Sequence, residues 1–134
     1  MPVTWGCHQA KQVKERICIV DDDEWVADSL KMLLETFGFE VQSYSSGCEF
    51  LADARHCAVG CLLIDQHLHG MTGLDVVDRL QKEGVRVPTI LVSGRLDKKI
   101  RERASSLGVT SVIDKPFVPD RLVEVIRTAL RERN

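Results

Sequence analysis

The segment RICIVDDD, residues 16–23, places four apolar residues directly before three aspartates. Three later segments share this design, an apolar run that ends on polar side chains: CLLID at 61–65, TILVS at 89–93 and SVIDK at 111–115. If these runs are parallel strands, their carboxyl ends meet along one edge of the sheet, where open α/β sheets bind ligands. Acids, a hydroxyl and an ammonium group would then share one cleft. That combination predicts a site for a divalent metal ion and a phosphate group.

The remainder of the chain alternates strand-like and helical segments. We expect strands at 17–20, 40–44, 61–65, 89–93 and 111–114, and helices near 24–37, 47–54, 73–83, 97–107 and 119–132. Apolar residues in the helical segments recur every three or four positions, which places them on one face. The strands are rich in Ile, Leu and Val without alternation, which indicates a sheet covered on both sides. Successive strand–helix units predict a doubly wound α/β fold with a five-stranded parallel sheet.

Length and composition are typical of a single globular domain. The chain has 134 residues, of which 44% are hydrophobic and 28% charged, enough for a substantial core. We expect the domain to occupy residues 15–134, because residues 1–14 lack any periodicity and are typical of a flexible amino-terminal arm. Cys18 and Cys61 fall inside apolar runs, where cysteine behaves as a small hydrophobic residue, so we expect both in the core.

Charge and hydropathy exclude several classes of protein. A formal net charge of −2 gives no general attraction to nucleic acid or to anionic lipid. No apolar stretch approaches the roughly 20 residues that a membrane-spanning helix needs. The first residues lack the apolar core of a secretory signal, so we expect a cytoplasmic protein.

These motifs together resemble the receiver domain of two-component response regulators, which has a flavodoxin-like fold of five strand–helix units. The resemblance covers residues 15–133 and includes the loop DQHLHGMTG at 65–73 and the Lys-Pro pair at 115–116. It implies that Asp65 accepts a phosphoryl group, with Ser93 and Lys115 assisting, and that Lys115-Pro116 is a cis peptide. The magnesium ligands that it implies are Asp21 (through water), Asp22, Asp65 and the backbone carbonyl of His67. It also implies that His67 and Arg95 tune the lifetime of the phosphoryl group.

Each implied role has a physical reason. A carboxylate is a poor nucleophile toward a phosphate dianion because both are negative, and Mg²⁺ between them neutralises that repulsion. Lys115 is expected to pair with Asp65 at rest and with a phosphoryl oxygen afterwards, while Ser93 donates to another of these oxygens. Asp23 is the weakest candidate for the metal site, and we expect it to cap the first helix instead.

Two positions depart from the family's pattern. His69 stands where most receivers have proline, so the loop after Asp65 is expected to be less rigid. We interpret His67 and His69 as solvent-exposed loop histidines rather than metal ligands, because no third imidazole or cysteine is placed nearby. Val112 replaces the usual aromatic switch residue, so switching cannot operate through an inward-swinging ring.

The leading hypothesis is a stand-alone phosphoacceptor, a signalling protein rather than an enzyme, whose partner is a sensor histidine kinase or phosphotransfer protein. A homodimer through the last two helices and the fifth strand is a second implied partner. The basic segment 95–103 is interpreted as a solvated helix face or a protein-binding surface, and nucleic-acid binding is disfavoured. One alternative is a haloacid-dehalogenase-like phosphohydrolase, in which Asp21 would be the nucleophile. Another is a pseudo-receiver that binds partners without phosphorylation.

Overall fold

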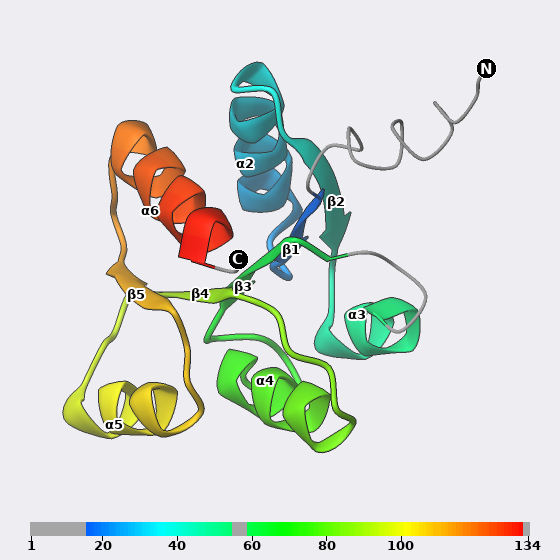
Figure 1. Cartoon of the computed structure of the whole chain (residues 1–134), viewed down its shortest axis with the longest axis vertical. Helices are drawn as coiled ribbons and strands as arrows, with labels where there is room; N and C mark the ends of the chain where they lie inside the picture. The colour runs from blue at the N-terminus through cyan, green and yellow to red at the C-terminus, as the bar shows by residue number, and fades with distance from the viewer. Residues whose placement is uncertain (1–15, 55–58, 133–134) are drawn as a thin grey trace.

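The computed structural model describes residues 16–54 and 59–132 and confirms the expected order of strands and helices (Figure 1). The strands are β1 (Arg16–Val20), β2 (Glu40–Tyr44), β3 (Cys61–Asp65), β4 (Thr89–Ser93) and β5 (Ser111–Asp114). The helices are α2 (Glu24–Thr36), α3 (Gly47–Ala54), α4 (Gly73–Lys82), α5 (Lys98–Ser106) and α6 (Pro119–Glu132). The expected arm at 1–14 lies outside the described residues, so the boundary of the domain at residue 15 stays a prediction.

All strand pairs are parallel, and the sheet has the order β2-β1-β3-β4-β5. After β1 the chain adds β2 on one side, and it then crosses to the other side of β1 to add β3. The point between β1 and β3 is therefore the topological switch of the sheet, where ligands of doubly wound folds bind. Asp21 and Asp22 follow β1 and Asp65 ends β3, so the candidate acids lie at this switch.

Helices cover both faces of the sheet, as the continuous apolar strands predict. Figure 1 shows α2 and α6 on one side of the sheet and α3, α4 and α5 on the other. Alternate residues of β1 divide between these layers: Ile17 and Ile19 pack with α2 and α6, whereas Cys18 and Val20 pack with the other helices. None of the helices within residues 16–54 and 59–132 is long and apolar enough to cross a membrane.

Local signals at the helix ends explain where several helices begin and end. Asp23 caps α2 as expected, because its side chain accepts hydrogen bonds from the backbone N–H groups of Trp25 and Val26. Thr72 and Asp75 form a reciprocal capping box at the start of α4. Gly38 follows α2 with φ of +93°, a left-handed conformation that glycine adopts without steric cost. These caps fix the helices relative to the strand ends that carry the candidate site.

Ile126 of α6 tests the contribution of the layer formed by α2 and α6. Its side chain is fully buried, so Ile126→Ala removes apolar contacts and leaves a cavity. We expect the free energy of unfolding in urea to fall by about 2–5 kcal/mol. Met32→Ala is the control, because Met32 is 71% exposed and its loss should change stability by less than about 0.5 kcal/mol. Equal effects of the two substitutions would contradict the assigned packing of α6.

Candidate functional site

The polar residues at the strand ends meet at the carboxyl edge of the sheet. The register pairs Asp65 with Val92 of β4, and it pairs Ser93 with Asp114 of β5. Lys115 follows β5 directly, and its backbone N–H donates to the carbonyl oxygen of Ser93 at 2.9 Å. The sequence therefore predicted the relative positions of these groups from strand order alone.

Asp65 lies at the centre of this arrangement and uses both of its carboxylate oxygens. Lys115 Nζ donates to Oδ2 at 3.1 Å, which confirms the expected ion pair. The backbone N–H of His67 donates to Oδ1 at 3.0 Å. The residue is buried, with only 8% of its surface exposed, so these contacts hold a negative charge that has little water around it. The peptide bond between Lys115 and Pro116 is cis, as expected.

Asp21 is the most buried of the site's acids, at 4% exposure. Burial raises the pKa of its carboxyl above the ordinary value of 3.8, and the negative charges of Asp65 and Asp22 raise it further. A hydrogen bond from the backbone N–H of Asp23 to Oδ1, at 2.9 Å, and the charge of Lys115 lower it. The pKa of Asp21 is therefore raised mainly because its carboxyl is buried, and secondarily because other acids lie nearby.

Asp22 is bound by the loop that follows β3. Both the backbone N–H of His69, at 3.1 Å, and the Nδ1 atom of its ring contact the Oδ2 atom of Asp22. The imidazole is 97% exposed, which confirms the expectation of a solvent-exposed loop histidine. Its contact with Asp22 was not predicted, because sequence spacing does not show that residues 22 and 69 meet.

Ser93 is fully buried and its hydroxyl is engaged on two sides. The backbone N–H of Arg95 donates to Oγ at 3.0 Å, and Nε2 of His67 lies 2.9 Å from the same atom. Since the hydroxyl has one hydrogen, it can donate to His67 when Nε2 is the unprotonated ring nitrogen. The His67 side chain therefore contacts the hydroxyl, while its backbone contacts Asp65.

The donor set suits a hard divalent cation in its chemistry. Asp21, Asp22 and Asp65 supply carboxylate oxygens, the ligands that Mg²⁺ prefers. The pKa of Asp21 is raised by burial first and by the charges of Asp65 and Asp22 second, and a bound cation would oppose both effects. In the described part of the chain, no three His, Cys, Asp or Glu side chains are already arranged to hold a metal ion. The carboxylate of Asp22 contacts the ring of His69, and the carboxylate of Asp65 accepts a hydrogen bond from Lys115. The residues fit such an ion once these two carboxylates are released.

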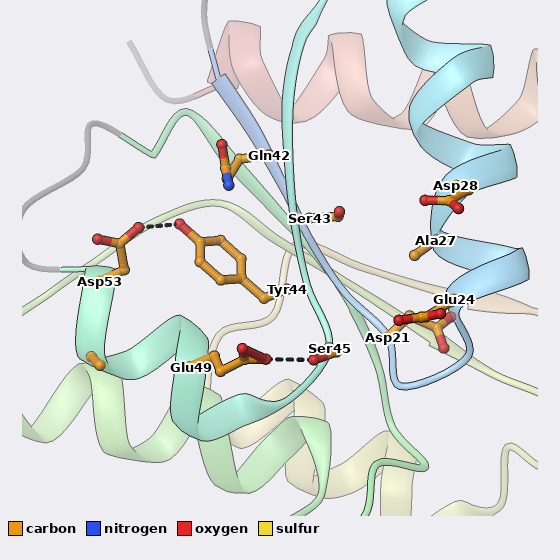
Figure 2. A pocket seen from close by; sticks show the side chains of 11 residues that line it. Asp21, Glu24, Ala27, Asp28, Gln42, Ser43, Tyr44, Ser45, Glu49 and Asp53 are labelled. Atoms are coloured by element: carbon orange, nitrogen blue, oxygen red, sulfur yellow. Dashed lines mark hydrogen bonds between the residues drawn. The ribbon is translucent and has the colours of Figure 1, made fainter.

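Two hollows lie beside the acids, one with basic residues in its lining and the other lined by carboxylates. One, of about 410 Å³, is lined by Asp65, His67, Gly94, Arg95 and Lys115. The other, of about 690 Å³, lies between α2, β2 and α3 (Figure 2). Its lining carries the carboxylates of Asp21, Glu24, Asp28, Glu49 and Asp53, with Lys and Arg absent from the described residues that line it. An anion is therefore favoured on the side of Arg95 and Lys115, and a cation on the side of Asp21.

The loop between β3 and α4 depends on two residues whose role sequence reasoning missed. A Cβ atom at Gly73 would lie 2.6 Å from the carbonyl oxygen of Asp65, so only glycine permits the close approach of α4 to the strand end. Buried Gln66 accepts a hydrogen bond from the backbone N–H of Leu74 through Oε1, at 2.9 Å. The glycine was visible in the motif at 65–73, but its close contact required the three-dimensional structure.

Replacing Asp21 with Asn should stabilise the metal-free protein. Because the folded-state pKa of Asp21 lies above 3.8, its ionised form opposes folding: this cost is absent below pH 3.8 and grows as the pH rises through the raised pKa. Asparagine keeps an oxygen that accepts from Asp23 and removes the charge. In urea with EDTA, we expect the free energy of unfolding to rise by about 1 kcal/mol near pH 7 and to change little near pH 4.

Asp97→Asn is the matched control for this stability measurement. Asp97 caps α5 from an exposed position, and asparagine is an equally good cap, so stability should change by less than about 0.5 kcal/mol at either pH. A loss of stability in Asp21→Asn near pH 7 would contradict the proposed cost of the buried charge.

Comparisons with known proteins identify the family of this chain. A family model described as the response regulator receiver domain matches residues 17–127. The chain is 33% identical over 144 residues to response regulator protein TodT of Pseudomonas putida, covering 98% of this chain and 63% of TodT. It is 30% identical over 119 residues to transcriptional regulatory protein FixJ of Bradyrhizobium diazoefficiens, covering 89% of this chain and 58% of FixJ.

The fold is also shared with solved structures. A CheY-like response regulator receiver domain protein from Methanospirillum hungatei superposes with a TM-score of 0.85 and 31% identity, covering 90% of this chain and 96% of that one. The chain spans about 63% of the length of TodT and 58% of the length of FixJ. The chain belongs to the response regulator receiver family of two-component systems, and its five-stranded parallel sheet has the flavodoxin-like receiver fold.

Proposed function

We propose that this domain accepts a phosphoryl group on Asp65, in the cytoplasm, from a sensor histidine kinase or a phosphotransfer protein. The observation that carries the proposal is the ion pair between Asp65 and Lys115 at the switch point of the sheet, beside Asp21 and the buried hydroxyl of Ser93. Sensor kinases phosphorylate response regulators as a family, and this site contains the groups that the reaction needs.

The transfer uses the contacts of the resting site. A carboxylate oxygen of Asp65 forms a bond to phosphorus while the bond between phosphorus and the donor breaks, and the electron pair of that bond leaves with the donor. Lys115 then moves from the carboxylate to a phosphoryl oxygen, and the hydroxyl of Ser93 leaves His67 to donate to another. Positioning and charge neutralisation supply the rate enhancement, as in other phosphoryl transfers.

Receiver domains generally bind Mg²⁺ at the phosphorylation site, and we propose the same here. Asp22, Asp65 and the backbone carbonyl of His67 would hold the ion directly, with Asp21 acting through water. The ion, when bound, neutralises the repulsion between the carboxylate and the incoming phosphate. The two flanking hollows support this arrangement, because the acidic one reaches Asp21 while the one beside Arg95 and Lys115 is the more favourable side for an anion.

The output of phosphorylation is proposed to pass through the loop at 94–98 and α5. Val112 is half-buried against the core on the side of α3, α4 and α5. It has no aromatic ring, so movement of this loop is proposed in place of an aromatic switch. Two arginines of α5 already join it to neighbouring elements: Arg101 pairs with Asp114 at 3.6 Å and Arg103 with Asp75 at 2.9 Å. A second copy docking through β5, α5 and α6 is the partner proposed for this surface.

Mass spectrometry of the intact protein tests the phosphoacceptor. The protein is incubated with Mg²⁺ and acetyl phosphate, beside Asp65→Asn and Asp21→Asn. We expect a single phosphoryl adduct in the wild type, none in Asp65→Asn, and slower formation in Asp21→Asn, which keeps the nucleophile but loses charge at the metal site.

Two other results would identify the alternatives. An adduct that survives Asp65→Asn and disappears in Asp21→Asn would make Asp21 the nucleophile, as in a haloacid-dehalogenase-like phosphohydrolase. If no small-molecule or protein donor produced an adduct, the proposal would fail in favour of a pseudo-receiver that binds partners without phosphorylation.

His67 and Arg95 are proposed to shield the phosphoryl group from water, since both line the hollow above Asp65. His67→Ala and Arg95→Ala should each shorten the lifetime of the phosphoprotein by roughly two- to tenfold, equivalent to at most about 1.4 kcal/mol of barrier. The decay of the adduct mass after removal of the donor measures this lifetime. Lys82→Ala, a change at an exposed residue of α4, is the control and should leave it unchanged. If the adduct decayed at the wild-type rate in both His67→Ala and Arg95→Ala, the proposed shielding would be wrong.

A further inference from the structure

His69 makes a twofold contact with one oxygen of Asp22 across 47 positions of sequence. Its backbone N–H lies 3.1 Å from Oδ2, and its ring Nδ1 contacts the same oxygen. A carboxylate oxygen only accepts hydrogen bonds, so Nδ1 carries the hydrogen in this contact. The loop after β3 is thereby tied to the end of β1.

Both contacts depend on the residue type at position 69. Proline, which most receivers have at this position, has no backbone N–H and no side-chain donor, so it could make neither. The other two acids are held differently: Asp21 by the backbone N–H of Asp23, and Asp65 by Lys115 and the backbone of His67. The hydrogen bonds to Asp22 therefore come from the histidine that this chain has where most receivers have proline.

The two contacts engage Oδ2, one of the two carboxylate oxygens that Asp22 can offer to the proposed magnesium site. An oxygen that accepts two hydrogen bonds has its lone pairs directed at the donors, and a cation repels both N–H groups. Mg²⁺ can use this oxygen only after at least one contact breaks. The imidazole is 97% exposed and can turn into water, whereas the Asp22 side chain is 22% exposed. The contact is therefore weak enough to open, yet it competes with the ion for the same carboxylate.

We propose that His69 is a positioning residue that latches Asp22 in the metal-free protein and competes with Mg²⁺ for the Asp22 carboxylate; this rests on the proposed magnesium site. The latch lowers the affinity for Mg²⁺ and keeps the site closed until the ion arrives. It acts through hydrogen bonds to Asp22 rather than as a metal ligand.

Calorimetric titration with Mg²⁺ alone, at one fixed pH and without phosphodonor, tests the latch. His69→Ala keeps the backbone donor and loses the ring, and His69→Pro loses both. His69→Asn keeps a side-chain N–H close to the position of Nδ1. Exposed ion pairs contribute modestly, so we expect the Kd to fall about two- to fivefold in His69→Ala and further in His69→Pro, and to stay near the wild-type value in His69→Asn.

The same titration separates failure of the latch from failure of the metal site. Equal Kd values in wild type and His69→Ala, or weaker binding in His69→Ala, would overturn the latch while leaving the site. A Kd for Mg²⁺ that falls as far in His69→Asn as in His69→Ala would also overturn the latch, because the side-chain donor that asparagine restores would then have no effect. Binding that persists unchanged in Asp22→Asn would instead overturn the assignment of the magnesium site, and the latch with it. Circular dichroism melts check that each variant is folded, and the Ala and Asn variants decide the test if the Pro variant is not.

Discussion

The ion pair between Lys115 and Asp65 is the contact on which the site depends, because it joins the end of the last strand to the end of the central one. Parallel register alone brings these partners together across 50 positions of sequence. Removing the ammonium would leave a buried carboxylate uncompensated, which is costly. In the proposed reaction, a phosphoryl group on Asp65 would offer Lys115 a new partner in place of the carboxylate.

The site brings together three acidic side chains whose negative charges repel one another. Of the three acids, Asp65 pairs with the ammonium of Lys115. The pKa of Asp21 is raised by burial and, to a smaller extent, by the charges of Asp65 and Asp22. Each carboxylate is therefore held by nearby N–H groups, including those supplied by the loop at 65–73. This loop contacts Asp22, Asp65 and the hydroxyl of Ser93. In the proposed activation, these contacts are exchanged for a cation and a phosphoryl group.

The sequence was sufficient to predict the strands, the helices and the shared edge, because each depends on local periodicity and on the rule that parallel strands align their ends. The core positions of Cys18 and Cys61 followed from the same apolar runs. The cap at Asp23 followed from the preference of aspartate for helix N-termini, and the ion pair of Lys115 with Asp65 was expected from the resemblance to receiver domains. The contacts of His67 with Ser93 and of His69 with Asp22 could not be predicted, since they join loops whose conformation no periodic pattern encodes. The close approach of Gly73 to Asp65 likewise depends on packing.

The central claim is that phosphorylation of Asp65 exchanges the resting contacts of the site. Amide ¹H–¹⁵N NMR spectra before and after addition of Mg²⁺ with beryllofluoride, a tetrahedral mimic of the phosphoryl group, test it most directly. We expect large chemical-shift changes for the backbone amides of His67, which donates to Asp65, and of Arg95, which donates to Ser93. These changes should be absent in Asp65→Asn. Shifts that persist in Asp65→Asn, or unmoved His67 and Arg95 amides in a protein that binds the mimic, would contradict it.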